Sequence, residues 1–312
     1  MKRTLAAIAI AVMTFSLAAC SDKTKTSPRP MVQEQLDMFL VEWSERDPDG
    51  ASELFAIEGV RVVSGDQLPA AGREQIKRSL AKGMGDSSPH DGTTLEASID
   101  QAREYPGGII VADGRFTVTD ADGKQVMTGK WGNVHRMVNG RMEVIMESAH
   151  AEDDPDADPA RFTKVSDLRP MPSKTDHTNA TPHAKAVDDC VASYSRGFNS
   201  RDGRIIAETF TTDGIQLVGS AKKPNRGRAA IMKAANEGFA GNPESSGQTL
   251  VAVPIRIQQI NDDLLVVNGV WEVRNDQGDM VKFGQWGNLL EIQPDGSALM
   301  VMESAGAYHN AE

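Results

Sequence analysis

The chain has 312 residues and a formal net charge of -11, from 33 basic and 44 acidic side chains. The basic residues form no run and do not alternate with aromatic residues. The sequence therefore argues against nucleic acid as a partner and against an anionic membrane surface bound through charge. An acidic excess of this kind chiefly favours solubility.

The first twenty residues have the pattern of an export signal. Lys2 and Arg3 form a positive region, and an apolar stretch from Leu5 to Ala19 follows. This stretch is short against the ~20 residues that cross a bilayer, which favours a signal peptide. Its end, Leu-Ala-Ala followed by Cys20, resembles a bacterial lipobox. The resemblance implies cleavage before Cys20 and lipid attachment to that cysteine; the alternative is an ordinary signal peptide with a chance cysteine.

The residues after Cys20 extend this interpretation. Ser21, and not an aspartate, follows the cysteine. In the lipoproteins of Gram-negative bacteria that this pattern resembles, such a residue implies export onward to the outer membrane. The stretch 20–30 indicates a flexible tether. We therefore expect residues 1–19 to be a signal peptide, and the mature chain to be lipid-anchored in the bacterial envelope on the periplasmic face of the outer membrane.

Two long segments repeat each other at a nearly constant spacing. Trp131 and Trp286 stand in the same Trp-Gly-Asn frame, 155 residues apart. The same spacing relates Arg46-Asp47 to Arg201-Asp202, Phe55 to Phe210, Gly59 to Gly214, Gly72-Arg73 to Gly227-Arg228, and Asp113-Gly114 to Asn268-Gly269. Glu147 and Glu303, both within Met-Glu-Ser-Ala, are 156 residues apart, so one residue is inserted in the last turn. We infer two copies of one domain, each far longer than a solenoid repeat.

We take copy one as 31–151 and copy two as 184–309, with 152–183 as a linker rich in proline, aspartate, serine and threonine. Each copy begins with a helical pattern, and in copy one Val32, Leu36 and Trp43 share a helical face. A short second helix follows, which Asp47 and Asp202 are expected to cap. A short strand comes next, and then a helix that starts at the Gly-Arg pair.

Long strands make up the second half of each copy. In copy one they are predicted over 94–105, 109–119, 124–137 and 141–149. Asp120–Gly123 and Asn275–Gly278 fit hairpin turns. Asp113-Gly114 would also fit such a turn, but the run before it is short, so a glycine bulge inside one bent strand fits better. Helices followed by antiparallel strands predict an α+β domain.

This order of elements resembles the NTF2-like superfamily, and most closely its SnoaL-like and ketosteroid-isomerase-like branch. The likeness is carried by ERDPDGASELFAIEGVRVVSG, SRDGRIIAETFTTDGIQLVGS and the closing Trp-Gly-Asn and Glu-Ser-Ala strands. The resemblance implies that each copy is a cone, in which a curved antiparallel sheet wraps around N-terminal helices and leaves a pocket at its open end. Members include isomerases, dehydratases, cyclases and non-catalytic modules, so the fold leaves the activity open.

The resemblance also bears on how the copies are arranged. Domains of this kind often dimerise through the face of the sheet. A flexible linker of about thirty residues is long enough to let two copies in one chain turn to face each other. We therefore expect an intrachain pseudo-dimer that is a monomer in solution.

The repeated phrase supplies the candidate site residues. Side chains alternate along a strand, so Trp131, Asn133 and His135 share one face, as do Trp286 and Asn288 in copy two. Glu147 and Glu303 close an otherwise apolar strand face and could act as acids or bases with raised pKa values. The tryptophans and asparagines would then shape a ligand pocket. The alternative is that the tryptophan packs against a helix, the asparagine holds a bulge and the glutamate ends a solvated strand.

Other residues limit the chemistry. In copy one His135 would complete an acid/base set with Glu147, which favours copy one for catalysis, whereas His150 points to the opposite face. The three tyrosines occupy no equivalent positions, so no oxyanion donor is indicated. No motif has the spacing of a metal site, and no cofactor is expected. Cys190 follows a helical apolar pattern and is expected to be a buried structural thiol; if Cys20 carries lipid, no intrachain disulfide can form.

The sequence therefore predicts an envelope lipoprotein with two SnoaL-like domains. We expect a non-catalytic module that binds a small apolar ligand or another envelope protein, and that meets the membrane only through its lipid. The alternative is a cofactor-independent isomerase, dehydratase or hydrolase on a small apolar substrate, with Glu147 or Glu303 as general base.

Overall fold

The computed structural model describes residues 27–64, 66–84, 92–152, 181–218, 221 and 223–308. The predicted signal peptide with Cys20, most of the predicted tether, and residues 153–180 of the predicted linker lie outside this part of the chain. Within the described residues no helix is both long and apolar enough to span a membrane.

The two copies contain the same α-helices and strands in the same order. Copy one comprises α1 (Arg29–Glu45), α2 (Pro48–Glu53), β1 (Phe55–Val63), β2 (Ala70–Ala71), α3 (Arg73–Met84), β3 (Thr94–Tyr105), β4 (Ile109–Thr119), β5 (Gln125–Val138) and β6 (Arg141–Ala151). Copy two comprises α4 (Ala184–Asn199), α5 (Gly203–Glu208), β7 (Phe210–Val218), β8 (Asn225–Arg226), α6 (Arg228–Gly241), the 3-10 turn η3 (Pro243–Ser245), β9 (Thr249–Gln259), β10 (Leu264–Arg274), β11 (Met280–Ile292) and β12 (Ala298–Ala307).

Each copy folds into one six-stranded sheet covered by helices, which confirms the predicted α+β class. The strand orders are β2-β1-β6-β5-β4-β3 and β8-β7-β12-β11-β10-β9. The sheets are mixed: β1 runs parallel to β6 and β7 runs parallel to β12, while the long neighbouring strands pair antiparallel as expected. A parallel neighbour is possible there because the chain passes through a helix and four other strands between the two.

Local sequence features explain the helix starts and the strand bend. Asp47 accepts hydrogen bonds from the backbone N–H groups of Asp49 and Gly50, and Asp202 caps α5 in the same way. Asp113-Gly114 lies inside the continuous strand β4, as predicted, and the extra residue of the bulge is Asp100 in the neighbouring strand β3. A side chain at Gly114 would collide with the Trp131 ring, so glycine lets this tryptophan lie against β4.

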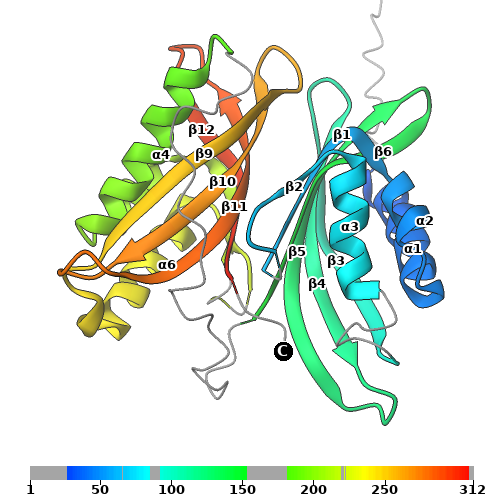
Figure 1. Ribbon diagram of the computed structural model, residues 1–312. Helices are drawn as coiled ribbons and strands as arrows, with labels where there is room; N and C mark the ends of the chain where they lie inside the picture. Colours follow the sequence, from blue (N-terminus) through cyan, green and yellow to red (C-terminus); the bar gives the residue numbers. More distant parts are fainter. Residues whose placement is uncertain are drawn as a thin grey trace, which may run out of the picture.

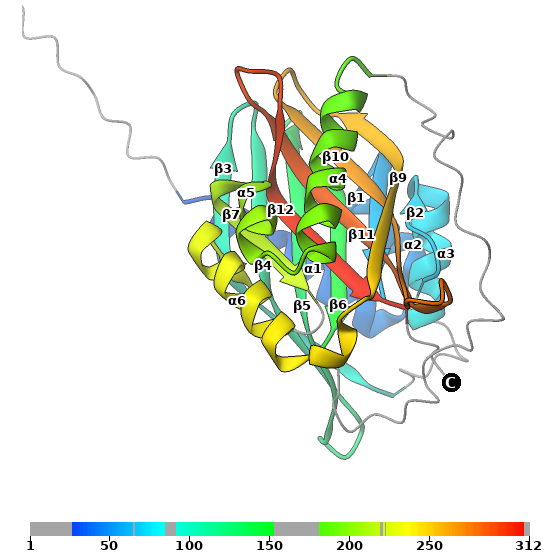
Figure 2. The ribbon, with the colours of Figure 1, turned by 90° about the vertical axis from the view of Figure 1, so that its left-hand side faces the viewer.

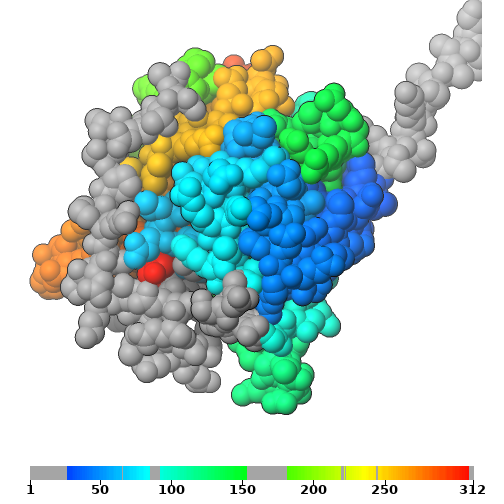
Figure 3. Space-filling model, turned by 45° about the vertical axis from the view of Figure 1, so that its right-hand side comes forward, coloured from blue at the N-terminus to red at the C-terminus, as the bar shows by residue number. Residues whose placement is uncertain are grey.

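The two sheets face each other and the helices lie outside them. Figure 1 shows the layers in order, with α1, α2 and α3 on one outer side and α4 and α6 on the other; Figure 2 shows α4, α5 and α6 in front of the second sheet. Figure 3 shows α1 and α2 (blue) and α3 (cyan) covering the outside of copy one. We call the side of each sheet that meets its own helices the helix face, and the side that meets the other sheet the contact face.

One buried apolar cluster joins the contact faces. It takes Val60, Val62, Val134 and Met146 from copy one and Ile215, Leu217, Leu289 and Met302 from copy two, among others. Separate clusters fill the helix faces: Trp43, Phe55, Ile76 and Leu80 in copy one, with Val32, Ile110 and Trp131 beside them, and Val187, Phe210, Ile231 and Trp286 in copy two. Each copy therefore has its own core, and the two copies share a third.

The contact between the sheets is nearly two-fold symmetric. A Cβ at Gly132 would lie 2.3 Å from the Leu217 side chain, and a Cβ at Gly287 would lie 2.9 Å from Val62, which is the equivalent of Leu217. The equivalent serines Ser148 and Ser304 hydrogen-bond to each other across the contact. The pseudo-axis therefore passes between the two Met-Glu-Ser-Ala strands.

We expect Gly132→Val to lower the free energy of unfolding by about 1–3 kcal/mol, because the new side chain overpacks the contact between the sheets. Urea unfolding measures the change. Gly238→Ala is the matched control: nothing lies within 4 Å of a Cβ there, so on α6 it should be neutral or slightly stabilising. Equal stability of the two variants would contradict the close approach of the sheets at Gly132.

Candidate functional site

The alternation of side chains divides the repeated phrase between the two faces. Trp131 packs with Val32 of α1 on the helix face. Asn133 stands opposite Glu147 in the β5–β6 pairing, which places both on that face. Gly132 lies on the contact face. In copy two Trp286 packs with Val187 of α4 on the helix face in the same way. One phrase therefore contributes both to the joint between the copies and to the interior of each copy.

The carboxylate of copy one is held in an ion pair. Glu147 lies on β6 and is 8% exposed. Its Oε2 accepts a hydrogen bond from Nε of Arg61 at 2.9 Å. The Arg61 guanidinium also donates to Oγ of Ser79 on α3 at 2.6 Å. The charge of Glu147 is thus balanced by the Arg61 guanidinium. An acid/base role for Glu147 would first require breaking this largely buried ion pair.

The carboxylate of copy two has neutral partners. Glu303 lies on β12 and is 4% exposed. Its Oε2 accepts a hydrogen bond from Nε2 of Gln216 at 2.9 Å, and the Tyr194 hydroxyl on α4 is also hydrogen-bonded to it. Burial raises the pKa of Glu303 to about 7, although these two hydrogen bonds oppose the rise. Burial and the neighbouring Glu303 carboxylate raise the pKa of Tyr194 well above 10, so the tyrosine stays a neutral donor.

Two substitutions between the copies cause this difference. Gln216 occupies the position of Arg61, and Tyr194 occupies the position of Phe39. Asn225 at the sheet edge completes the arrangement, because its Nδ2 donates to Oε1 of Gln216 at 3.0 Å and fixes the amide orientation. Tyr194 was not among the predicted site residues because it has no tyrosine counterpart in copy one. The useful signal was the opposite one: a tyrosine and a glutamine replace a phenylalanine and an arginine around the same glutamate.

Copy one instead carries a row of buried polar atoms without hydrogen-bond partners. Among the described residues neither ring nitrogen of His135 has a hydrogen-bond partner, nor do Nε1 of Trp131 and Oδ1 of Asn133. Oε1 of Gln35 on α1 is also buried without a hydrogen-bond partner among these residues. His135 stands opposite Ile110 and Val144, both of which belong to helix-face clusters. Burial lowers the pKa of His135 to about 3, so the imidazole is neutral.

The same positions are less polar in copy two. Leu290 replaces His135, and Cys190 replaces Gln35. Nε1 of Trp286 donates to the carbonyl oxygen of Val270 at 3.1 Å. Nδ2 of Asn288 lies 3.7 Å from Sδ of Met300, which leaves Oδ1 of Asn288 as the polar atom without a partner. The predicted site residues thus line two different interiors, with neutral hydrogen-bonding groups in copy one and a protonatable carboxylate in copy two.

The structure also shows the surroundings of the buried cysteine and the two histidines that the sequence singled out. Cys190 is buried on α4, and burial raises the pKa of its thiol to about 12, as suits a structural thiol. His150 lies on the contact face between Ser64 and Ser148, away from Glu147. No hydrogen bond joins His135 to Glu147 among the described residues, although both lie on the helix face. In the same part of the chain no three histidine, cysteine or acidic side chains are grouped to hold a metal.

A surface hollow lies outside both interiors. It runs along the exposed side of α1 and is lined by residues that include Gln33, Asp37, Met38 and Val41. None of the candidate site residues borders it. The chemistry of the repeated phrase therefore belongs to the helix faces and not to this groove.

No family model and no curated protein matches the chain. Solved structures are similar to about two fifths of it. They include an NTF2-like protein of unknown function from Shewanella oneidensis (14% identity, 39% of this chain and 98% of that one, TM-score 0.34) and a ketosteroid isomerase-like protein from Erwinia carotovora atroseptica (16%, 41% and 97%, 0.34). A domain of unknown function with a cystatin-like fold from Nostoc punctiforme gives 11%, 41% and 78%, with a TM-score of 0.36. At these TM-scores the likenesses say nothing of activity.

We expect Glu303 to make the protein less stable as the pH rises. Its pKa is about 7 in the folded protein against 4.5 ordinarily, so the folded state holds this proton more tightly. The resulting stability is complete below pH 4.5 and is lost as the pH rises through 7. Relative to Glu303→Gln, the wild type should lose roughly 3 kcal/mol of unfolding free energy over this window.

Urea unfolding at a series of pH values measures this difference. Glu208→Gln is the control, because Glu208 lies in an exposed ion pair with Arg204 and should leave the slope unchanged. The assignment would be wrong if wild type and Glu303→Gln showed the same dependence on pH.

Proposed function

We propose that copy one binds a small, mostly apolar molecule with neutral hydrogen-bonding groups, at the helix face of its sheet. The row formed by Trp131, Asn133 and His135 carries this proposal, because these buried polar atoms have no partner among the described residues. Each unsatisfied buried polar group costs about 1–3 kcal/mol. A bound molecule that supplies the missing partners would recover that cost.

The row also limits the kind of molecule. The indole N–H of Trp131 needs a hydrogen-bond acceptor and Oδ1 of Asn133 needs a donor. The neutral imidazole of His135 has one donor nitrogen and one acceptor nitrogen. A ligand with both a donor and an acceptor on an apolar frame meets these needs. A charged ligand is disfavoured, because Arg61 and Glu147 already neutralise each other and a buried unpaired charge is costly.

The lipid anchor remains part of the proposal. A diacylated Cys20 would hold this binding domain at the periplasmic face of the outer membrane, within reach of apolar molecules that partition into the envelope. The Leu-Ala-Ala-Cys sequence at the end of the apolar stretch supports this placement. The mass of the mature N-terminal peptide, with or without the acyl groups, tests it.

A second candidate function rests on copy two. Glu303 is a buried carboxylate with a pKa of about 7, and a general base is most effective when its pKa lies near the working pH. Once Glu303 has taken a proton from the substrate it is a neutral acid that can itself donate, which frees the Tyr194 hydroxyl to donate to the developing enolate oxygen. This arrangement favours cofactor-independent proton transfer next to a carbonyl group, and it moves the acid/base candidate from Glu147 to Glu303.

We expect His135→Leu to raise the free energy of unfolding by about 1–3 kcal/mol and to abolish ligand binding. The substitution removes a buried imidazole without partners and copies Leu290 of the second domain. Benzamide is a suitable probe, because it carries an amide donor and acceptor on an apolar ring. NMR titration of the Trp131 indole N–H and the His135 ring should show it in wild type only.

Leu290→His is the matched control. It should lower the free energy of unfolding by a similar amount, because it places in copy two a buried imidazole without partners, the group that His135→Leu removes from copy one. Benzoate and toluene, which lack respectively the neutral polar group and any polar group, should shift the Trp131 resonance less than benzamide does. A more stable His135→Leu protein that still binds benzamide would contradict the proposed site.

We expect slow isomerisation of a β,γ-unsaturated cyclic ketone if copy two transfers protons. The rate should rise as Glu303 ionises near pH 7 and fall at least about a hundredfold in Glu303→Gln, because the general base is lost. Ultraviolet absorbance of the conjugated product measures the rate. Glu147→Gln is the control and should retain the rate; equal losses in both variants, or no reaction in wild type, would rule out this second function.

A further inference from the structure

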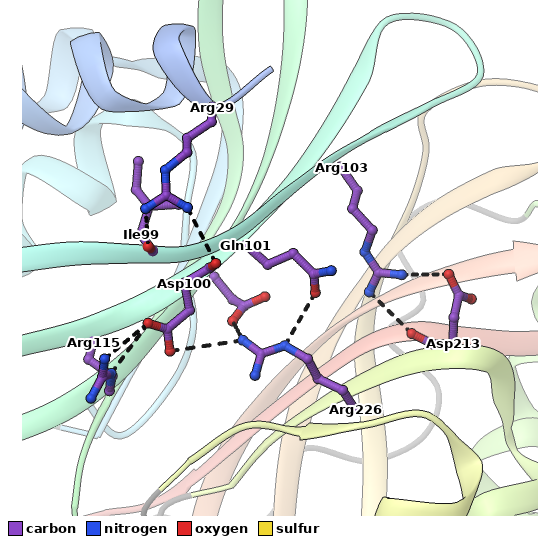
Figure 4. Close-up of polar contacts among 9 residues, drawn as sticks. Arg29, Ile99, Asp100, Gln101, Arg103, Arg115, Asp213 and Arg226 are labelled. Carbon is purple, nitrogen blue, oxygen red and sulfur yellow. Dashed lines mark hydrogen bonds and ion pairs between the residues drawn. The ribbon is translucent and has the colours of Figure 1, made fainter. Parts of the chain in front are cut away.

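The contact between the two copies departs from two-fold symmetry at the buried carboxylate of Asp113. Asp113 of β4 lies on the contact face and is 0% exposed. Arg226 of β8, in the other copy, forms an ion pair with its Oδ2. Figure 4 shows the Arg226 side chain extending to copy one, where its Nε also donates to Oε1 of Gln101 at 3.2 Å and its guanidinium lies 3.9 Å from Asp100. Copy one provides acids here and copy two provides the cation.

The symmetry-related place lacks this ion pair. Asn268 occupies the position of Asp113, and Ala71 occupies the position of Arg226. Asp100 and Gln101 correspond to Ile255 and Arg256. The ion pair between Asp113 and Arg226 therefore exists on one side of the pseudo-axis, and Asn268 and Ala71 occupy the equivalent positions on the other side.

A second departure concerns size, and it lies on the pseudo-axis. His150 and Gly306 are equivalent positions of the two Met-Glu-Ser-Ala strands, one copy's imidazole facing the other copy's glycine. A Cβ at Gly306 would stand 2.2 Å from Nδ1 of His150 and 2.6 Å from Oγ of Ser64. The imidazole is itself buried and bridges Ser64 and Ser148. Copy two thus leaves a space that the side chain of copy one fills.

We propose that the contact face of each copy is built to pair with the other copy and not with its own kind. The two observations are independent, since one depends on charge and the other on volume. The first domain of the chain therefore pairs selectively with the second domain, and neither pairs well with a second copy of itself.

Pairing of like copies fails on both counts. Two copies of domain one would each place Asp113 opposite Ala71, and would set one imidazole against the other where a single one fits. Two copies of domain two would each place Arg226 opposite Asn268, and would leave a void between two glycines. A buried charge without its partner lowers an association constant by about a hundredfold or more.

A neighbouring ion pair does not discriminate. Arg103 binds the side chain and the carbonyl oxygen of Asp213 across the contact, as Figure 4 shows. Glu58 is the equivalent of Asp213, so a pair of first copies would still offer Arg103 an acid. The selectivity therefore rests on Asp113 with Arg226 and on His150 with Gly306.

The test uses the folded chain, cut after folding. A specific protease site is placed between residues 153 and 180, the protein is cleaved, and isotope-labelled and unlabelled samples are mixed until their halves have exchanged. Native mass spectrometry then counts the pairs. We expect the wild type to give one first half with one second half in nearly every particle, with like pairs below about one in twenty. Unselective pairing would give like and unlike pairs in a 1:2:1 ratio.

Two variants remove the asymmetry in opposite ways. Asp113→Asn with Arg226→Ala and His150→Gly gives the two copies the same neutral, small residues at these three pairs of equivalent positions. Asn268→Asp with Ala71→Arg and His150→Gly instead builds the ion pair on both sides. Both should move the population towards 1:2:1, and the second remains informative if the first folds poorly.

Lys185→Ala, which breaks an exposed ion pair with Asp189, is the matched control and should leave the unlike pairs intact. Gly306→Ala adds a probe of volume: its methyl group collides with His150, so the nicked halves should separate at concentrations at which the wild type stays paired. A wild-type population near 1:2:1 would overturn the proposal, and so would unchanged selectivity in both symmetrised variants.

Discussion

The close approach of the two sheets at Gly132 and Gly287 is the constraint on which the rest depends. Because side chains alternate, a strand that gives its glycine to the contact face must give the residues on either side of it to the helix face. Trp131 and Asn133 are thereby directed towards the helices of their own copy. The Met-Glu-Ser-Ala strand obeys the same rule, with Ser148 at the pseudo-axis and Glu147 in the interior. The same repeated strands that form the contact between the sheets therefore also place equivalent residues in the interiors of both copies.

The two interiors then differ through few substitutions. Around the glutamate, an arginine and a phenylalanine in copy one become Gln216 and Tyr194 in copy two, which exchanges an ion pair for neutral hydrogen bonds. Along the strand before it, His135 becomes Leu290, which removes a buried polar group. The first change makes the carboxylate of copy two available for proton exchange, and the second leaves copy one as the interior with unfilled hydrogen bonds. One scaffold thereby holds two different environments.

The sequence predicted the fold well and the site only in part. Helices, hairpins and the continuous strand at Asp113-Gly114 could be predicted because turn chemistry and periodicity are local. The parallel neighbours β1 and β6 could not, since they lie about eighty residues apart and no local pattern encodes their direction. The faces of Trp131, Asn133 and Glu147 followed from alternation. The partners of these side chains could not be predicted. Arg61 contacts Glu147 from β1, whose neighbour in the sheet no local pattern indicates, and Tyr194 contacts Glu303 from helix α4.

Placing both copies in one chain makes such differences possible. In a symmetric homodimer every substitution appears twice, so a buried acid on the contact face appears on both sides of the axis and an enlarged side chain on the axis meets itself. A joined pair is free of this restriction. Asp113 faces Arg226 on one side of the pseudo-axis, while Asn268 and Ala71 occupy the equivalent positions on the other side, and the equivalent positions His150 and Gly306 differ in size. The contact can then specify which half pairs with which. The same freedom extends to the interiors, where Glu147 keeps its arginine while Glu303 has lost the equivalent cation, and neither change disturbs the other.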